Sequence, residues 1–122
     1  MKKRLMVVDD SRMIELQIRK LLEGTEFEVA AYCENGEEAI ARYGEVQPDL
    51  VTMDIIMPGI DGLETAQVIL GEHPEAKILM VSSLAYGDAI QEADCAGTLG
   101  ILNKPLDRET LLSTLGEVMS PV

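Results

Sequence analysis

The chain has 122 residues, a formal net charge of -12 and a hydrophobic content of 47%, which suits one compact domain with a single core. The negative charge argues against direct nucleic-acid binding, because phosphate backbones require a basic surface. The apolar runs are short, and none approaches the roughly 20 residues of a membrane-spanning helix. The basic start is followed by Asp9 and Asp10 rather than by a long apolar stretch, which argues against a signal peptide. We therefore expect one cytoplasmic domain over residues 1–122, with no membrane partner.

Five short apolar segments recur along the chain and predict the strands of one sheet. Continuous apolar runs of this length are typical of strands that are buried on both faces. The predicted strands are Leu5–Val8, Phe27–Tyr32, Leu50–Met53, Ile78–Val81 and Leu99–Leu102.

Helical patterns lie between these strands. The first helix has an apolar face that includes Ile14 and Ile18, and it ends at Gly24, a residue common just after helices. The second helix has Asn35 as a candidate N-cap, with Glu38 as its reciprocal partner.

Three further helices complete the pattern. One follows Asp61 and Gly62 and ends before Pro74, a weakly patterned one covers Ala85–Cys95, and the last follows Asp107. Strands that alternate with helices in this way predict an α/β fold of the (βα)5 flavodoxin-like type. This fold is a doubly wound, five-stranded parallel sheet with helices on both faces.

The cysteines and the histidine show no pattern of a metal site. Cys33 and Cys95 form no CxxC motif and stand beside apolar residues, so we expect reduced, partly buried thiols. His73 is the only histidine and precedes Pro74, which predicts an exposed loop residue without a second histidine to share a metal.

Polar residues follow four of the five predicted strands. In chain order they are Asp9 and Asp10, Asp54, Ser82 and Lys104. The carboxyl ends of parallel strands lie at one edge of a sheet, where α/β folds carry their binding sites. Each residue has a structural explanation when taken alone, such as helix capping by the acidic pair. Their joint position at successive strand ends favours a shared site.

The residue types suggest a metal-assisted phosphoryl site. Three clustered carboxylates repel one another unless a cation lies among them, and all-oxygen ligands with room for water suit Mg²⁺. Lys104 supplies a positive charge for a phosphate, Ser82 supplies a hydroxyl donor, and a carboxylate can act as nucleophile. No residue is placed as a general base for water, which predicts a phosphoryl group that is accepted and held.

Four segments of the sequence resemble the response regulator receiver domain of two-component signalling, in the order found in that family and over almost the whole chain. They are Val7–Ser11, Asp49–Gly62, Met80–Ser83 and Lys104–Pro105. The second segment is the most specific, because it surrounds Asp54 with the family's Met-Pro and Asp-Gly residues.

The resemblance implies a role for each site residue. Asp54 would accept a phosphoryl group from a sensor histidine kinase or a phosphotransfer protein, and Ser82 and Lys104 would contact that group. The Lys104–Pro105 bond would be cis. The output surface, which would bind an output protein or a fused effector domain, would comprise residues 85–95, 99–103 and 107–119. The implied Mg²⁺ ligands are the carboxylates of Asp9, Asp10 and Asp54 and the backbone carbonyl of Ile56.

The sequence departs from the family pattern at one position, and two more beside the site are apolar. Ile101 stands where the family often has a Tyr or Phe that rotates on phosphorylation, and Tyr86 is a weak candidate to replace that ring. Ile56 and Leu84 occupy places that influence how readily water attacks the phosphoaspartate. Neither side chain can orient a water molecule, so the resemblance implies slow loss of the phosphoryl group.

Three other functions compete with the receiver. A Mg²⁺-dependent phosphatase of the haloacid dehalogenase type also uses an aspartate nucleophile, but it requires a DxD motif that is absent at Asp9-Asp10-Ser11. A flavodoxin-like cofactor binder would need a hydroxyl- and glycine-rich loop there. A degenerate receiver would lack site residues. Among receivers, the sequence leans weakly towards the chemotaxis type, as a stand-alone protein or as the input half of a longer one.

Overall fold

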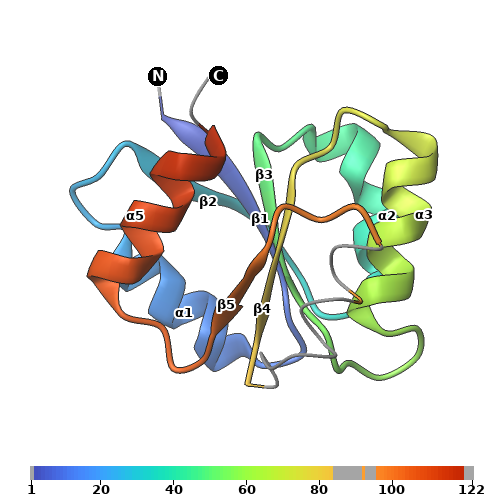
Figure 1. Ribbon diagram of the computed structural model, residues 1–122, viewed down its shortest axis with the longest axis horizontal. Helices are drawn as coiled ribbons and strands as arrows, with labels where there is room; N and C mark the ends of the chain where they lie inside the picture. The colour runs from blue at the N-terminus through green and yellow to red at the C-terminus, as the bar shows by residue number, and fades with distance from the viewer. Residues whose placement is uncertain (1, 84–91, 93–95, 120–122) are drawn as a thin grey trace.

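The computed structural model describes residues 2–83, 92 and 96–119. Five parallel strands form one sheet in the order β2-β1-β3-β4-β5 (Figure 1). The strands are β1 (Lys3–Val8), β2 (Phe27–Cys33), β3 (Leu50–Asp54), β4 (Ile78–Ser82) and β5 (Ile101–Asn103). The described helices are α1 (Arg12–Leu21), α2 (Gly36–Val46), α3 (Gly62–Glu72) and α5 (Arg108–Met119).

This architecture confirms the predicted doubly wound fold. The helix predicted over Ala85–Cys95, together with Leu84 and Tyr86, lies outside the described residues. None of the helices that the structure describes is long and apolar enough to cross a membrane.

The helices cover both faces of the sheet, with α1 and α5 on one side and α2 and α3 on the other (Figure 1). Side chains alternate between the two faces along each strand. In β1, Leu5 and Val7 join the core under α1 and α5, whereas Met6 and Val8 join the core under α2 and α3. Both faces of the central strands are therefore apolar, which explains why these strands are continuous apolar runs in the sequence.

The strand pairing brings the carboxyl ends of the strands to one edge. Val8 pairs with Met53, Asp54 pairs with Val81, and Ser82 pairs with Asn103 in the next strand. Residues at these positions, or just after them, consequently lie side by side although the chain separates them widely.

The fifth strand begins later than predicted, so the prediction was wrong at the start of this strand. The strand was expected over Leu99–Leu102 but covers Ile101–Asn103, and Leu99 is 45% exposed. Gly100 has a φ of 149°, a positive value that L side chains rarely adopt and that departs from strand geometry. The chain therefore becomes regular β-structure only after this glycine.

The predicted cap of the second helix is confirmed in one half and corrected in the other. The side chain of Asn35 accepts a hydrogen bond of 2.8 Å from the Glu38 N–H, as expected for an N-cap. The Glu38 carboxylate does not return to Asn35. It lies 3.4 Å from the Glu34 N–H, one residue earlier, and it also pairs with Arg42.

Cys33 and His73 are more enclosed than predicted. Cys33 is completely buried and free, and burial raises the pKa of its thiol to about 11, so the thiol stays protonated at neutral pH. His73 is the C-cap residue of α3 and is partly exposed. Its ring packs against Tyr43 with centroids 4.6 Å apart. Cys95 lies outside the described residues.

Candidate functional site

Three carboxylates meet at the edge of the sheet where β1 and β3 end. Asp9 follows β1 and is buried, Asp54 is the last residue of β3 and is 8% exposed, and Asp10 is exposed. One oxygen of each carboxylate lies within 4.8 Å of the others. This set of hard oxygen donors, open to water at Asp10, fits a Mg²⁺ ion, which usually keeps several waters and binds few carboxylates.

Lys104 is the positive charge within this group. Its Nζ lies 2.9 Å from Oδ2 of Asp9 and 3.5 Å from Oδ1 of Asp54. The backbone N–H of Lys104 donates to the Ser82 carbonyl at 3.0 Å, so the ends of β4 and β5 hold the lysine in place. The Lys104–Pro105 peptide bond is cis, as expected.

The electrostatics of the site favour an added cation. Burial raises the pKa of Asp54 to about 6, and the negative charge of Asp9 acts in the same direction. Lys104 and a hydrogen bond from the Ile55 N–H oppose this change without cancelling it. One lysine therefore does not neutralise the three carboxylates, and a bound divalent cation would.

Asp9 is held by contacts on each of its polar groups. Its N–H donates to the Cys33 carbonyl at 3.0 Å, and its Oδ1 accepts from the Ser11 N–H at 2.9 Å. Its carbonyl accepts from the Tyr32 hydroxyl at 2.8 Å. The N-cap of α1 is Ser11, without a side-chain capping bond, so the acidic pair does not serve as the helix cap.

The remaining predicted residues take different positions around this group. Ser82 is buried at the end of β4, one residue beyond the strand partner of Asp54. Ile56 follows β3 and is 60% exposed. Ile101 is half-buried and packs against the core under α2 and α3. Ile101 is therefore a packing residue at the position where the family often has a rotating aromatic ring.

The loop after β3 returns to the end of that strand through Gly62. The Gly62 N–H donates to the Ile55 carbonyl at 2.7 Å, and the Asp61 side chain caps α3 by accepting from the Glu64 N–H at 2.8 Å. A Cβ atom on Gly62 would lie 1.9 Å from the carbonyl oxygen of Asp54. Sequence reasoning identified Asp61-Gly62 as a helix start but missed this approach to Asp54, because the contact depends on the path of the loop.

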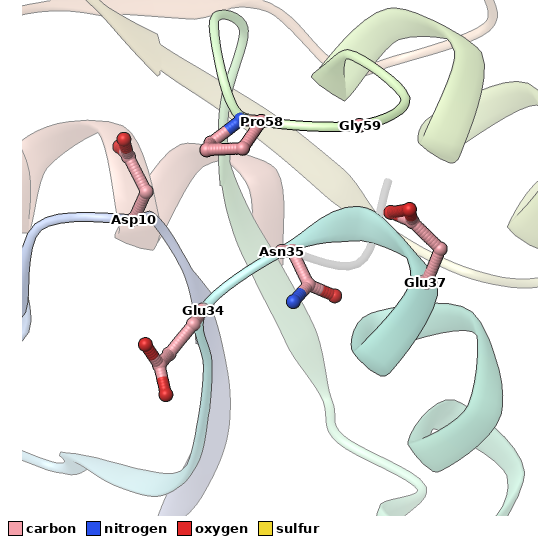
Figure 2. Close-up of a pocket in the computed structure, with 6 residues that line it drawn as sticks. All are labelled: Asp10, Glu34, Asn35, Glu37, Pro58 and Gly59. Carbon is pink, nitrogen blue, oxygen red and sulfur yellow. The ribbon is translucent and has the colours of Figure 1, made fainter.

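A hollow of about 440 Å³ borders the site beside Asp10 (Figure 2). Two further acidic residues, Glu34 and Glu37, line it together with Asn35, Pro58 and Gly59. The edge around the site is therefore strongly negative. This field attracts cations and repels a phosphate group unless positive charge is added.

Comparison with known proteins relates this chain to chemotaxis proteins. The chain is 37% identical to the chemotaxis protein CheY of Listeria monocytogenes over 112 residues, which are 92% of this chain and 94% of the relative. It is 40% identical over 102 residues to the protein-glutamate methylesterase/protein-glutamine glutaminase of Halobacterium salinarum, a match that covers 82% of this chain and 29% of that protein.

Solved structures of similar fold lead to the same group. A chain of the CheX-CheY-BeF3-Mg²⁺ complex of Borrelia burgdorferi matches with a TM-score of 0.92 at 27% identity, covering 98% of this chain and 90% of that one. The response regulator domain of Thermotoga maritima CheB matches with a TM-score of 0.90 at 27% identity, covering 99% and 100%. The model of the response regulator receiver domain matches residues 5–116, and the chain belongs to this family.

Proposed function

We propose that Asp54 is the phosphoacceptor of this receiver domain, which fills residues 1–122 and switches its partner-binding surface when it is phosphorylated. The observation that carries the proposal is the position of the Asp54 carboxylate. It lies at the end of the central strand β3, with Lys104 at 3.5 Å and two further carboxylates beside it. A buried carboxylate in this setting is suited to attack a phosphorus atom, provided that the site gains positive charge.

The reaction moves a phosphoryl group from a histidine nitrogen to the aspartate. An Oδ atom of Asp54 forms the new O–P bond while the P–N bond of the donor phosphohistidine breaks, and the freed imidazole nitrogen takes up a proton. Lys104 pairs with the negative phosphoryl oxygens, and the Ser82 hydroxyl donates to one of them. When bound, Mg²⁺ would supply the remaining positive charge. Its ligands would be the carboxylates of Asp9, Asp10 and Asp54 and the Ile56 carbonyl.

The switch would begin with a change of partner for Lys104. Its Nζ lies closer to Asp9 than to Asp54, and a phosphoryl group on Asp54 offers it more negative charge. Ser82 lies at the end of β4, next to β5, so its movement towards the phosphoryl group would alter the surface formed by β5 and α5. The partners of the protein would be a histidine kinase or phosphotransfer protein and an output protein or fused effector domain.

The proposal is tested by adding Mg²⁺ with acetyl phosphate or beryllofluoride. The wild-type protein should gain one phosphoryl group by mass from acetyl phosphate and should change its amide NMR spectrum with either reagent, and Asp54→Asn should do neither. Asp49→Asn is the matched control, because Asp49 is exposed and lies just before the start of the same strand, at the end opposite to Asp54. Labelling that persists in Asp54→Asn would contradict the proposal. Continuous turnover of phosphate esters would instead support the phosphatase alternative.

We also expect Ile56→Asn to shorten the lifetime of the phosphorylated protein. The exposed Ile56 side chain follows β3 directly after Ile55 and offers no hydrogen-bonding group, whereas an amide there can orient an attacking water. One such hydrogen bond in the transition state corresponds to about a tenfold faster loss of phosphate. Phosphate release from labelled protein measures the rate, and Val68→Asn, at an exposed position of α3, is the control. Equal lifetimes in all three proteins would refute this expectation.

A further inference from the structure

The acidic pair at the end of β1 has one contact that no sequence pattern indicated. Tyr32 lies in β2, the edge strand next to β1, and its hydroxyl donates to the Asp9 carbonyl at 2.8 Å. The regular pairing of the two strands ends at Val8 and Cys33, with one more bond from the Asp9 N–H to Cys33. The tyrosine thus adds one hydrogen bond just beyond the last paired residues of β1 and β2, where the chain leads into α1.

The hydrogen bond from Tyr32 also affects Asp10, through the peptide bond between Asp9 and Asp10. The Asp9 carbonyl and the Asp10 nitrogen belong to one planar unit, so a hydrogen bond that holds the carbonyl also sets the direction in which Asp10 leaves the strand. The Asp9 side chain has its own contacts to Ser11 and Lys104. Among the described residues, none makes a hydrogen bond or an ion pair to the Asp10 side chain. Its orientation therefore depends on the backbone.

The ring of Tyr32 is itself held in place. The guanidinium of Arg12 lies 5.4 Å from the ring centroid, a distance typical of a cation–π contact. Arg12 in turn pairs with the buried Glu15 at 2.8 Å. The ring contact therefore holds the Tyr32 hydroxyl at the Asp9 carbonyl.

We propose that Tyr32 is a positioning residue for the Mg²⁺ site, which acts by fixing the Asp9–Asp10 peptide and so pre-orienting the Asp10 carboxylate. This inference rests on the proposed metal site. Partners of metal ligands typically change metal affinity by 10- to 100-fold when they are lost. Because Tyr32 contacts the backbone next to the ligand rather than the carboxylate itself, we expect a loss of about tenfold, at the lower end of that range.

The test compares Tyr32→Phe with Tyr43→Phe. The first change removes one oxygen atom and keeps the ring over which Arg12 lies. The second makes the same chemical change in α2, at a ring that packs against His73. Mg²⁺ alone is titrated into each protein and followed by the amide NMR signals of Asp10 and Ser11, and urea unfolding in EDTA gives the stability without metal. We expect the Mg²⁺ dissociation constant to rise about tenfold in Tyr32→Phe and to stay unchanged in Tyr43→Phe.

The outcomes separate this inference from the proposed function. If wild-type protein does not bind Mg²⁺, the metal site itself is wrong. If wild-type binds Mg²⁺ and Tyr32→Phe binds it equally well, the positioning role is wrong although the metal site stands. A Tyr32→Phe protein that loses stability in EDTA without any change in the Mg²⁺ dissociation constant would show that the hydroxyl serves only the fold.

Discussion

Gly62→Ala is expected to destabilise the protein by ~2–3 kcal/mol, the upper part of the range for overpacked sites, and to weaken its response to Mg²⁺. The new Cβ would lie 1.9 Å from the carbonyl oxygen and 2.8 Å from the carbonyl carbon of Asp54, and 3.0 Å from Cα of Ile55. All three are backbone atoms at the end of β3, so no side chain can rotate out of the way. Relief requires a shift of the backbone that carries Asp54, which would move the carboxylate relative to Asp9 and Lys104.

Gly71→Ala is the matched control for this experiment. Gly71 is also in α3, but a Cβ there would meet no heavy atom within 4 Å. Alanine favours the helix and reduces the freedom of the unfolded chain, so this variant should gain ~0.4–1 kcal/mol. Urea unfolding in EDTA compares the free energies of unfolding, and labelling by acetyl phosphate with Mg²⁺ compares the sites. Equal stability of the two variants would show that the loop after β3 yields without strain.

Asp54→Asn is expected to stabilise the metal-free protein at neutral pH by ~2–3 kcal/mol, because a tenfold difference in proton affinity between the folded and unfolded states corresponds to about 1.4 kcal/mol. Burial and the charge of Asp9 raise the pKa of Asp54 from 3.8 to about 6 in the folded state. A raised pKa means that the folded state binds the proton more tightly than the unfolded state. The stability that protonated Asp54 contributes is complete below about pH 3.8 and is lost as the pH rises through about 6.

The direction of this pKa shift predicts how the difference in stability between Asp54→Asn and wild-type changes with pH. Asparagine carries no charge, so the variant should exceed wild-type in stability at pH 7 in EDTA, and the difference should shrink towards zero as the pH falls to about 4. Lys104 should keep its contact with Asp9, which lies at 2.9 Å in the wild-type protein. Urea unfolding at several pH values measures the difference, with Asp49→Asn as the control for the loss of a carboxylate charge outside the site.

Mg²⁺ should reverse the order of stability. A cation that binds the folded wild-type site stabilises it by mass action, and Asp54→Asn lacks one charged ligand and should gain less. A variant that is less stable than wild-type at pH 7 in EDTA would mean that the Lys104 contact, at 3.5 Å, outweighs the burial of the Asp54 charge.

The order and type of the elements could be predicted because their signals are local. The apolar runs of the strands and the cap at Asn35 depend on neighbours within a few residues, and the Asn35 side chain accepts from the Glu38 N–H as expected. The fifth strand was misplaced at Leu99, because an apolar run does not reveal the positive φ at Gly100. The burial of Cys33 was underestimated, since β2 runs one residue further than its apolar pattern indicated.

The sequence by itself determined the composition of the candidate site. Parallel strands end at one edge, so acidic residues after two strands and a lysine after another had to converge, and Asp9, Asp10, Asp54 and Lys104 do so. Only the tertiary structure decided three further features: the raised pKa of Asp54, the hydrogen bond from Tyr32 to Asp9 and the close approach of Gly62 to the Asp54 carbonyl. Each results from atoms that the packing of separate segments brings together, and no local or periodic pattern in the sequence indicates such distances.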